Sequence, residues 1–419
     1  MRSWNEPVIP TVPGPVVTVR LRDTASSRLT DGPTGDEVAV YVCGITPYDA
    51  THLGHAATYV TFDVLLRLFR DAGQRVTYVQ NVTDVDDPLL ERAVRDGVDW
   101  TELAAMETSL FRQDMEALRV IPPTHYVGVV ESINAIAADV EALMDRGCAY
   151  TLPVPEGSAT VDGAQDVYLD VGTCPRFGQV SGWSRDEMVA VWAERGGDPE
   201  RPGKHDIFDP LLWRAARPGE PQWPHRRLGP GRPGWHIECT SIAMDRLGIP
   251  FDIQGGGSDL IFPHHEMSAA QAQALTGATR YASTYVHQAM VSYQGHKMSK
   301  SRGNLVLVSA LRERGVDPST IRLALLAHHH GTDWEFVDTD LDAAGQRLAH
   351  WREAFAAPAG PAGDVAAAQV RAALADDLDS PRALAVVDQW AAGALAGQDE
   401  DPTAPELVRD LVDALLGVL

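Results

Sequence analysis

The stretch VAVYVCGITPYDATHLGH, residues 38–55, decides the fold, because it joins a buried strand to the start of a helix. Its first six residues are β-branched or apolar, which is typical of a strand in a parallel sheet. Apolar residues then recur every three or four positions up to Asp71, and Val76 to Val82 forms a second apolar run. This order predicts a βαβ unit, and therefore an α/β protein with a parallel sheet.

Changes in residue composition and hydrophobic pattern along the 419 residues predict the domain organisation. Eight prolines between Pro199 and Pro233 exclude a long regular helix there and favour an insertion that splits the sheet domain. We expect helices over residues 89–120 and 130–147. The expected segments are an irregular leader (1–36), a Rossmann-type catalytic domain (37–121 and 231–300), an inserted connective domain (122–230), a stem segment (301–345) and a C-terminal helical bundle (346–419).

Composition narrows the class of protein. The chain carries 35 basic and 58 acidic residues, a net charge of −23, and this acidity argues against a nucleic-acid partner, which would need a basic face. No apolar run reaches the ~18 residues of a membrane span, and prolines interrupt the first residues where a signal peptide would be apolar. Four cysteines in a chain of this length make no disulfide framework. We therefore expect a cytoplasmic protein without a membrane partner.

Two short motifs predict a nucleotide site. His52-Leu53-Gly54-His55 lies where a strand turns into a helix, and backbone N–H groups at such a junction favour phosphate. The chain has only three lysines, yet Lys297 and Lys300 stand together in KMSKSRGN, residues 297–304. Ammonium groups on such a loop suit the charge that develops on phosphates. Each motif is weak alone, but together they nominate His52, His55, Lys297 and Lys300 as catalytic residues.

Several cysteine and histidine residues near these two motifs could be either core residues or the ligands of a metal ion. Cys43 ends the first strand, Cys239 follows Trp235, and His264 and His265 follow a glycine-rich turn. Residues so far apart in sequence are most often core residues. A catalytic zinc site, however, needs three protein ligands and an open fourth position, and each of these residues falls beside a predicted nucleotide loop. Cys148 and Cys174 are predicted core residues.

HLGH and KMSKS, in this order, resemble the signature motifs of class I aminoacyl-tRNA synthetases, which activate amino acids as adenylates. Further blocks are similar to those of cysteinyl-tRNA synthetases: YVCGITPY (41–48), NVTDVDD (81–87), GRPGWHIEC (231–239) and GGGSDLIFPHHE (255–266). The resemblance implies one Zn²⁺ per chain, held by Cys43, Cys239 and His264, that binds the thiol of L-cysteine. It also implies a set of residues around the cysteinyl-adenylate: Cys43, Gly44, Ile45, Thr46, Thr58, Asn81, Val82, Thr83, Trp235, Gly257, Ser258, Asp259 and Val291.

The sequence departs from the tRNA synthetases in four places. Ser268 stands where they have a fourth, glutamate zinc ligand, and Ala57 and Pro88 replace basic residues. Residues 346–419 contain five arginines and no lysine against twelve acidic residues, and leave no room for an anticodon-binding domain. Finally, ERGGDP at 194–199 resembles a signature of the cysteine:glucosaminyl-inositol ligases of mycothiol biosynthesis, which take a sugar amine in place of tRNA.

This second resemblance implies an AMP-forming ligase. It would join L-cysteine to the amine of glucosaminyl-inositol through a cysteinyl-adenylate, with ATP, Mg²⁺ and zinc, as a monomer. A truncated cysteinyl-tRNA synthetase is the alternative, and a non-catalytic binding module is a third hypothesis. The sequence assigns no residue to the acceptor, no base to its amine, and no role to His328–His330 or to the connective domain.

Overall fold

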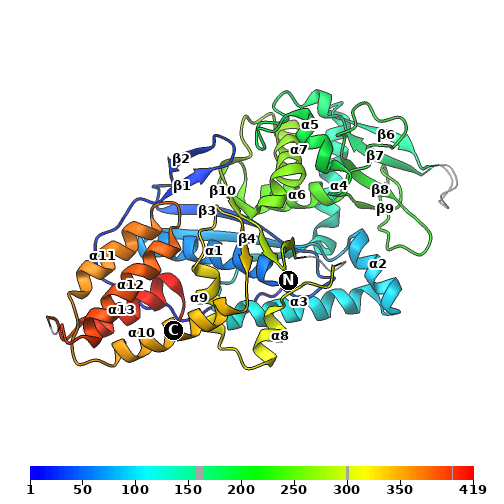
Figure 1. The fold of residues 1–419 in the computed structure, drawn as a ribbon. Coiled ribbons are helices and arrows are strands. Elements are labelled where there is room, and N and C mark those ends of the chain that lie inside the picture. Colours follow the sequence, from blue (N-terminus) through cyan, green and yellow to red (C-terminus); the bar gives the residue numbers. More distant parts are fainter. Residues whose placement is uncertain (156–163, 299–301, 399) are drawn as a thin grey trace.

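A five-stranded parallel sheet lies at the centre of the protein, in a computed structural model that describes residues 1–155, 164–298, 302–398 and 400–419 (Figure 1). Neighbouring strands are all parallel, in the order β11-β10-β3-β4-β5. The strands are β3 (Glu37–Ile45), β4 (Arg75–Val82), β5 (His125–Gly128), β10 (Phe251–Gly257) and β11 (Ala282–Gln288). The predicted α/β fold with a Rossmann-type parallel sheet is confirmed.

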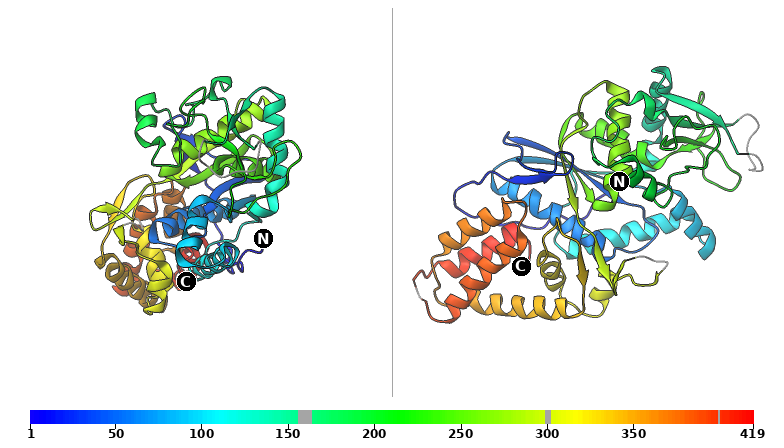
Figure 2. Two further views of the ribbon diagram at one scale, coloured as in Figure 1. Left: turned by 90° about the vertical axis from the view of Figure 1, so that its right-hand side faces the viewer. Right: turned by 45° about the horizontal axis from the view of Figure 1, so that its top comes forward.

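Helices cover both faces of the sheet. Helix α1 (Leu53–Asp71) connects β3 to β4 on one side, and on the other lie α4 (Val129–Asp145), α6 (Trp235–Leu247) and α7 (Glu266–Thr276), as Figures 1 and 2 show from three directions. Side chains of β3 alternate between the two faces. Val40 and Val42 belong to the core that contains α1, whereas Tyr41 and Cys43 belong to the core that contains α4 and α6. The pleat of β3 therefore directs Cys43 toward α6.

The helical region expected over residues 89–120 consists of two helices, α2 (Asp87–Asp96) and α3 (Trp100–Ala117). Gly97 separates them with a left-handed backbone, φ +66°, which glycine adopts without a steric penalty. Asp99 then begins α3, because its side chain accepts hydrogen bonds from the amides of Thr101 and Glu102. The prediction of one continuous helix is wrong at this point.

The described part of the connective region contains a small antiparallel sheet and the helix α5 (Arg185–Trp192), and it forms the green lobe of Figure 1. Its strands follow the order β6-β7-β8-β9, and α5 contacts the π turn Ile261–His265 that follows β10. The predicted insertion begins at residue 122, but β5 pairs with β4, so the parallel sheet extends past that boundary. The strand bounds are Ala149–Pro153, Gln165–Leu169, Leu211–Ala215 and Gly231–Pro233.

Part of the segment expected as an irregular leader is a β-hairpin. Strands β1 (Arg20–Asp23) and β2 (Arg28–Asp31) pair with each other. Leu21 and Asp23 point inward, and the Asp23 carboxylate accepts a hydrogen bond of 2.9 Å from the amide of Tyr285 on β11. Contact with β11, which lies far away in sequence, thus stabilises a hairpin that local composition alone does not predict.

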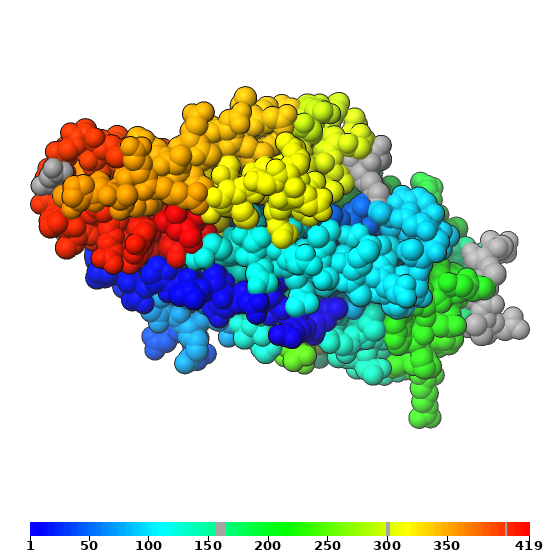
Figure 3. All heavy atoms as spheres, turned by 90° about the horizontal axis from the view of Figure 1, so that it is seen from below, coloured from blue at the N-terminus to red at the C-terminus, as the bar shows by residue number. Residues whose placement is uncertain are grey.

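After the parallel sheet the chain forms a small sheet and a helical region. The order of this sheet is β13-β12-β14, with bounds His296–Lys297, Val291–Tyr293 and Trp334–Phe336. The helices are α8 (Val308–Glu313), α9 (Pro318–Leu326), α10 (Thr339–Phe355), α11 (Gly363–Leu374), α12 (Ser380–Leu395) and α13 (Ala404–Leu411). Seen from below in Figure 3, the C-terminal helices, coloured orange to red, occupy one end of the molecule.

Candidate active site

Two cysteines and a histidine from three separate segments meet beside the sheet. Cys43 lies near the carboxyl end of β3, Cys239 lies in α6, and His264 lies in the π turn Ile261–His265 after β10. One ligand atom of each lies within 4.8 Å of the other two, and all three residues are buried. Two sulfurs and one imidazole form a donor set that suits a thiophilic divalent ion such as zinc.

The two thiols of this cluster differ in acidity. Burial raises the pKa of the Cys43 thiol well above its usual value. Burial opposes ionisation of Cys239 as well, but a hydrogen bond from Cys43 and the neighbouring His264 outweigh it, so the pKa of Cys239 is well below its usual value. One thiolate is therefore already stabilised at this position, and a thiolate is the form of cysteine that binds metals.

Further buried side chains surround the three. Nε2 of His265 lies 3.2 Å from the Cys43 sulfur, and the Gln254 amide donates to the same sulfur at 3.5 Å. Nδ1 of His236 lies 3.0 Å from Nδ1 of His264 and helps to fix that ring. His236 was not predicted from the sequence, although its position three residues before Cys239 on one helix places both on the same face.

The positions after His264 do not add a metal ligand among the described residues. Ser268 is buried and its hydroxyl is directed to the carbonyl of His236, at 3.5 Å. The Glu266 carboxylate accepts hydrogen bonds from the amides of Gly178, Val180 and Ser181, at 2.7 to 3.0 Å. Glu266 therefore anchors the connective region, and the cluster has three candidate protein ligands.

The HLGH motif lies at the start of α1. His52 caps this helix, since its Nδ1 accepts from the Gly54 amide at 3.0 Å, and its ring stacks on His55 with centroids 3.9 Å apart. Burial, helped by His55 and Lys297, lowers the pKa of His52 to about 2, and burial also lowers the pKa of His55. Both imidazoles are therefore neutral at physiological pH, and each has one N–H to donate.

Backbone hydrogen bonds bring the segment after KMSKS against HLGH, although the motifs are far apart in sequence. The Leu53 amide donates to the carbonyl of Val306, and the Val308 amide donates to the carbonyl of Thr51, both at 2.9 Å. The Lys297 ammonium lies 3.1 Å from the Asp259 carboxylate. Lys300, with Ser299 and Ser301, lies outside the described residues.

A cavity of about 1270 Å³ adjoins these groups and lies between the sheet and the connective region. Of the residues expected around the adenylate, four line it: Thr46, Trp235, Ser258 and Asp259. The expected catalytic residue Lys297 lines it as well. The Trp235 ring also stacks on His264, with centroids 4.4 Å apart. The predicted metal ligand His264 is thus connected to the cavity wall by an aromatic contact.

Other expected residues shape the strand ends behind the cavity. The Asn81 side chain accepts from the Gly44 amide at 2.8 Å and donates to Thr83 at 3.1 Å. A side chain at Gly44 would collide with the Asn81 carbonyl, at 1.6 Å, so only glycine fits there. Nine expected residues are not among the described lining residues: Cys43, Gly44, Ile45, Thr58, Asn81, Val82, Thr83, Gly257 and Val291.

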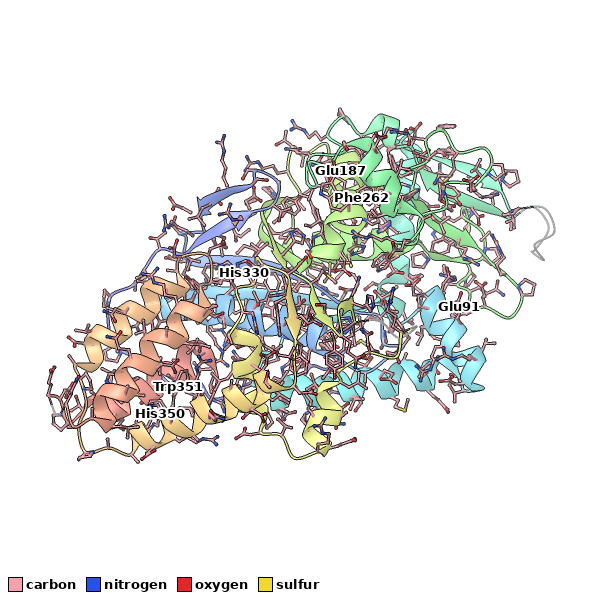
Figure 4. All side chains as sticks on the ribbon, viewed as in Figure 1. Glu91, Glu187, Phe262, His330, His350 and Trp351 are labelled. Carbon is pink, nitrogen blue, oxygen red and sulfur yellow. The ribbon has the colours of Figure 1, made fainter. Side chains whose placement is uncertain are left out.

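Four residues of the ERGGDP segment line the cavity: Glu194, Arg195, Gly196 and Asp198. The Arg195 guanidinium donates to the carbonyl of Asp259 at 2.8 Å and to that of Phe262 at 2.5 Å. Phe262, labelled in Figure 4 beside the helix that carries Glu187, is buried against Trp192 and other aromatic rings of the connective region. Arg195 and Phe262 therefore tie the connective region to the loop that carries Asp259 and His264.

This combination of a split parallel sheet, an HLGH helix start and a KMSKS sequence motif defines a class I synthetase catalytic domain. Residues 31–346 match the family model described as the tRNA synthetases class I (C) catalytic domain, and the chain belongs to this family. Solved structures share the fold: Mycobacterium tuberculosis methionyl-tRNA synthetase with methionyl-adenylate has a TM-score of 0.63 and 16% identity, covering 91% of this chain and 92% of that chain.

Within the family, the chain is similar from end to end to ligases. The L-cysteine:1D-myo-inositol 2-amino-2-deoxy-alpha-D-glucopyranoside ligase of Cellulomonas flavigena is 57% identical over 419 residues, and the protein of the same name from Streptomyces griseus subsp. griseus is 58% identical over 419 residues. Each alignment covers 100% of both chains. None of the described helices has the length and apolarity needed to cross a membrane.

Proposed function

We propose that this protein is an ATP-dependent ligase that joins L-cysteine to the amine of glucosaminyl-inositol, releasing AMP and pyrophosphate. The observation that carries the proposal is the buried cluster of Cys43, Cys239 and His264 beside the cavity. Trp235, which stacks on His264, and Lys297 both line this cavity. A thiol-binding position next to a nucleotide-activating loop suits cysteine activation. The full-length similarity to ligases with this name supports the acceptor.

The three residues of the cluster fit Zn²⁺, and we propose one ion per chain. Two cysteine sulfurs and one imidazole match the donors that zinc prefers, and three protein ligands leave one coordination position open. Zinc bound there would act as a Lewis acid toward a thiol. Because a serine hydroxyl is a poorer ligand for such a site, the cluster would select cysteine without a separate editing site.

For activation, the cysteine carboxylate attacks the α-phosphate of ATP, and pyrophosphate leaves. The neutral rings of His52 and His55 donate N–H groups to the triphosphate, and Lys297 and Lys300 compensate charge on the departing pyrophosphate, together with Mg²⁺. Asp259, whose pKa Lys297 holds below its usual value against the opposing effect of burial, remains ionised beside Lys297. This carboxylate is suited to orient Lys297 or to accept from ribose hydroxyls.

For ligation, the sugar amine attacks the cysteinyl carbonyl, the amide forms and AMP leaves. The part of the cavity bounded by ERGGDP lies on the connective side, opposite the sheet, and offers space for an acceptor. We also propose that the protein works as a monomer in the cytoplasm and does not bind nucleic acid. Four free cysteines and a net charge of −23 agree with a reducing compartment and with the absence of an RNA-binding face.

A choice of acceptors tests this function. Purified protein, ATP and L-cysteine are incubated either with glucosaminyl-inositol or with cysteine tRNA, and the cysteinylated product is identified by mass spectrometry. We expect cysteinyl-glucosaminyl-inositol and no cysteinyl-tRNA. The reverse result would identify a truncated tRNA synthetase. Absence of cysteine-dependent ATP–pyrophosphate exchange in zinc-replete protein would indicate a non-catalytic binding module.

A further inference from the structure

The wall of the cavity contains several carboxylates, and most of them are already paired with cations. Asp259 pairs with Lys297, Asp198 with Lys204, and Asp166 with Arg201 and Arg217. Asp87 pairs with two arginines of the connective sheet, Arg214 and Arg232. These carboxylates are held by their own partners and are poorly placed to receive a cationic ligand.

Asp86 differs from them. It lines the same cavity and is partly buried, and among the described residues the contact made by its side chain is a hydrogen bond of 2.8 Å from the amide of Asp87, its own helix neighbour. No ion pair involves it in the described part of the chain. Glu194 and Asp333 also line the wall and form no ion pair with any described residue, but both are exposed.

Asp86 lies close to the predicted adenylate residues and to the metal cluster. It follows β4, at the edge of the sheet where the predicted adenylate residues Asn81 and Thr83 also lie. Its charge interacts with His264 of the metal cluster and with Arg232, while Asp87 has the same sign. Burial raises the pKa values of Glu238 and Tyr48, and the charge of Asp86 raises both further. Burial, the largest effect on this carboxyl group, raises its pKa to about 6.

We propose that Asp86 binds the amine of the acceptor and takes its proton before ligation. This inference rests on the proposed function, in which a sugar amine is the acceptor. At neutral pH that amine is an ammonium, which cannot attack. One N–H bond breaks and its proton passes to the Asp86 carboxylate; the freed lone pair forms the C–N bond to the cysteinyl carbonyl. The C–O bond to phosphate then breaks, AMP leaves, and the second amine proton is lost to solvent.

The substitution Asp86→Asn separates this role from a structural one. Asp86 is the N-cap of α2, and asparagine caps helices as well as aspartate does, so α2 keeps its cap while the charge is lost. Asp99→Asn is the matched control, because Asp99 caps the next helix, α3, and its side chain is exposed outside the cavity.

Three readouts follow the steps separately: cysteine-dependent ATP–pyrophosphate exchange, transfer from preformed adenylate to glucosaminyl-inositol in a single turnover, and transfer to hydroxylamine, which is largely uncharged at neutral pH and needs no base. For Asp86→Asn we expect acceptor transfer to fall about 100-fold, as for loss of a general base, with exchange and hydroxamate formation within about 2-fold of wild type. Asp99→Asn should behave as wild type in all three.

The results distinguish the proposals. Acceptor transfer by Asp86→Asn equal to that of Asp99→Asn would overturn the role of Asp86. An equal loss of exchange, acceptor transfer and hydroxamate formation would overturn it as well, because it would place Asp86 in activation or in folding. If the wild-type protein forms adenylate but transfers cysteine to no sugar amine, the proposed function itself is refuted, and the role of Asp86 with it.

Discussion

Replacing Asp63 by asparagine should markedly destabilise the protein, because Asp63 is the centre of a buried charge cluster. Its carboxylate contacts the guanidinium of Arg67 at 2.6 Å and that of Arg322, and accepts from the Ile121 amide at 2.7 Å. Arg67 also donates to the Asp413 carbonyl at 2.9 Å. The cluster therefore joins α1, which His52 caps, to α9 and to the C-terminal end of the chain.

The expected loss in the free energy of unfolding depends on the interactions that Arg67 and Arg322 keep after the substitution. Burial alone would raise the pKa of Asp63, but Arg322 and Arg67 outweigh it and hold the pKa below its usual value, so the carboxylate is ionised. Asparagine keeps the volume and one acceptor, yet leaves two buried guanidiniums without a counter-charge. Removing one partner of a buried ion pair typically costs ~3–5 kcal/mol. Because backbone carbonyls still bind both arginines, we expect a loss near ~3 kcal/mol.

Thermal unfolding measures this loss. At ~2.1 cal/mol/K per residue, a chain of this size has an unfolding entropy near ~0.9 kcal/mol/K, so ~3 kcal/mol corresponds to a decrease in Tm of about 3 °C. Urea unfolding at pH 7 gives the free energy directly. The control is Asp376→Asn, whose partner Arg20 is 49% exposed and whose loss should cost under ~1 kcal/mol. Equal destabilisation by the two substitutions would refute the importance that we assign to the buried cluster.

Three further predictions concern the metal cluster, the connective region and pH. Cys239→Ala should lose its bound zinc, measured by elemental analysis, and its cysteine-dependent ATP–pyrophosphate exchange. The control Cys174→Ala, which replaces another buried cysteine, should retain both. Retention of zinc by Cys239→Ala would argue against the proposed metal site. Glu266→Ala should keep its zinc but become more susceptible to proteolysis near Gly178, Val180 and Ser181, whose amides donate hydrogen bonds to the Glu266 carboxylate. Loss of zinc from this variant would indicate that Glu266 is a metal ligand. His52 and His287 have folded pKa values lowered by burial to about 2 and about 3. In the unfolded chain both histidines bind protons below pH ~6.5, whereas in the folded protein they stay neutral. Each histidine should therefore lower the free energy of unfolding by about 1.4 kcal/mol for every pH unit below that value. A urea midpoint that does not decrease when the pH is lowered from 7 to 5.5 would contradict this prediction.

Local patterns were sufficient for the central unit and for the class of protein. The apolar run before Cys43, the helical spacing after His52 and the second run after Gly73 each describe consecutive residues, and the predicted parallel sheet is confirmed. Helical periodicity was less reliable where the backbone conformation of a single residue ended a helix. Gly97 divides the helix expected over 89–120, because its left-handed backbone cannot continue a helix.

The sequence by itself determined the βαβ unit, the nucleotide motifs and the resemblance to a cysteine-activating family, because strand and helix periodicity and short motifs are properties of neighbouring residues. Only the tertiary structure decided that three distant side chains lie within 4.8 Å of one another, that Arg195 faces inward, and that Asp86 lacks the cations that pair with other carboxylates of the described cavity wall. These features depend on strand order and on packing between segments that are tens to hundreds of residues apart, and no local pattern encodes a distance across the fold.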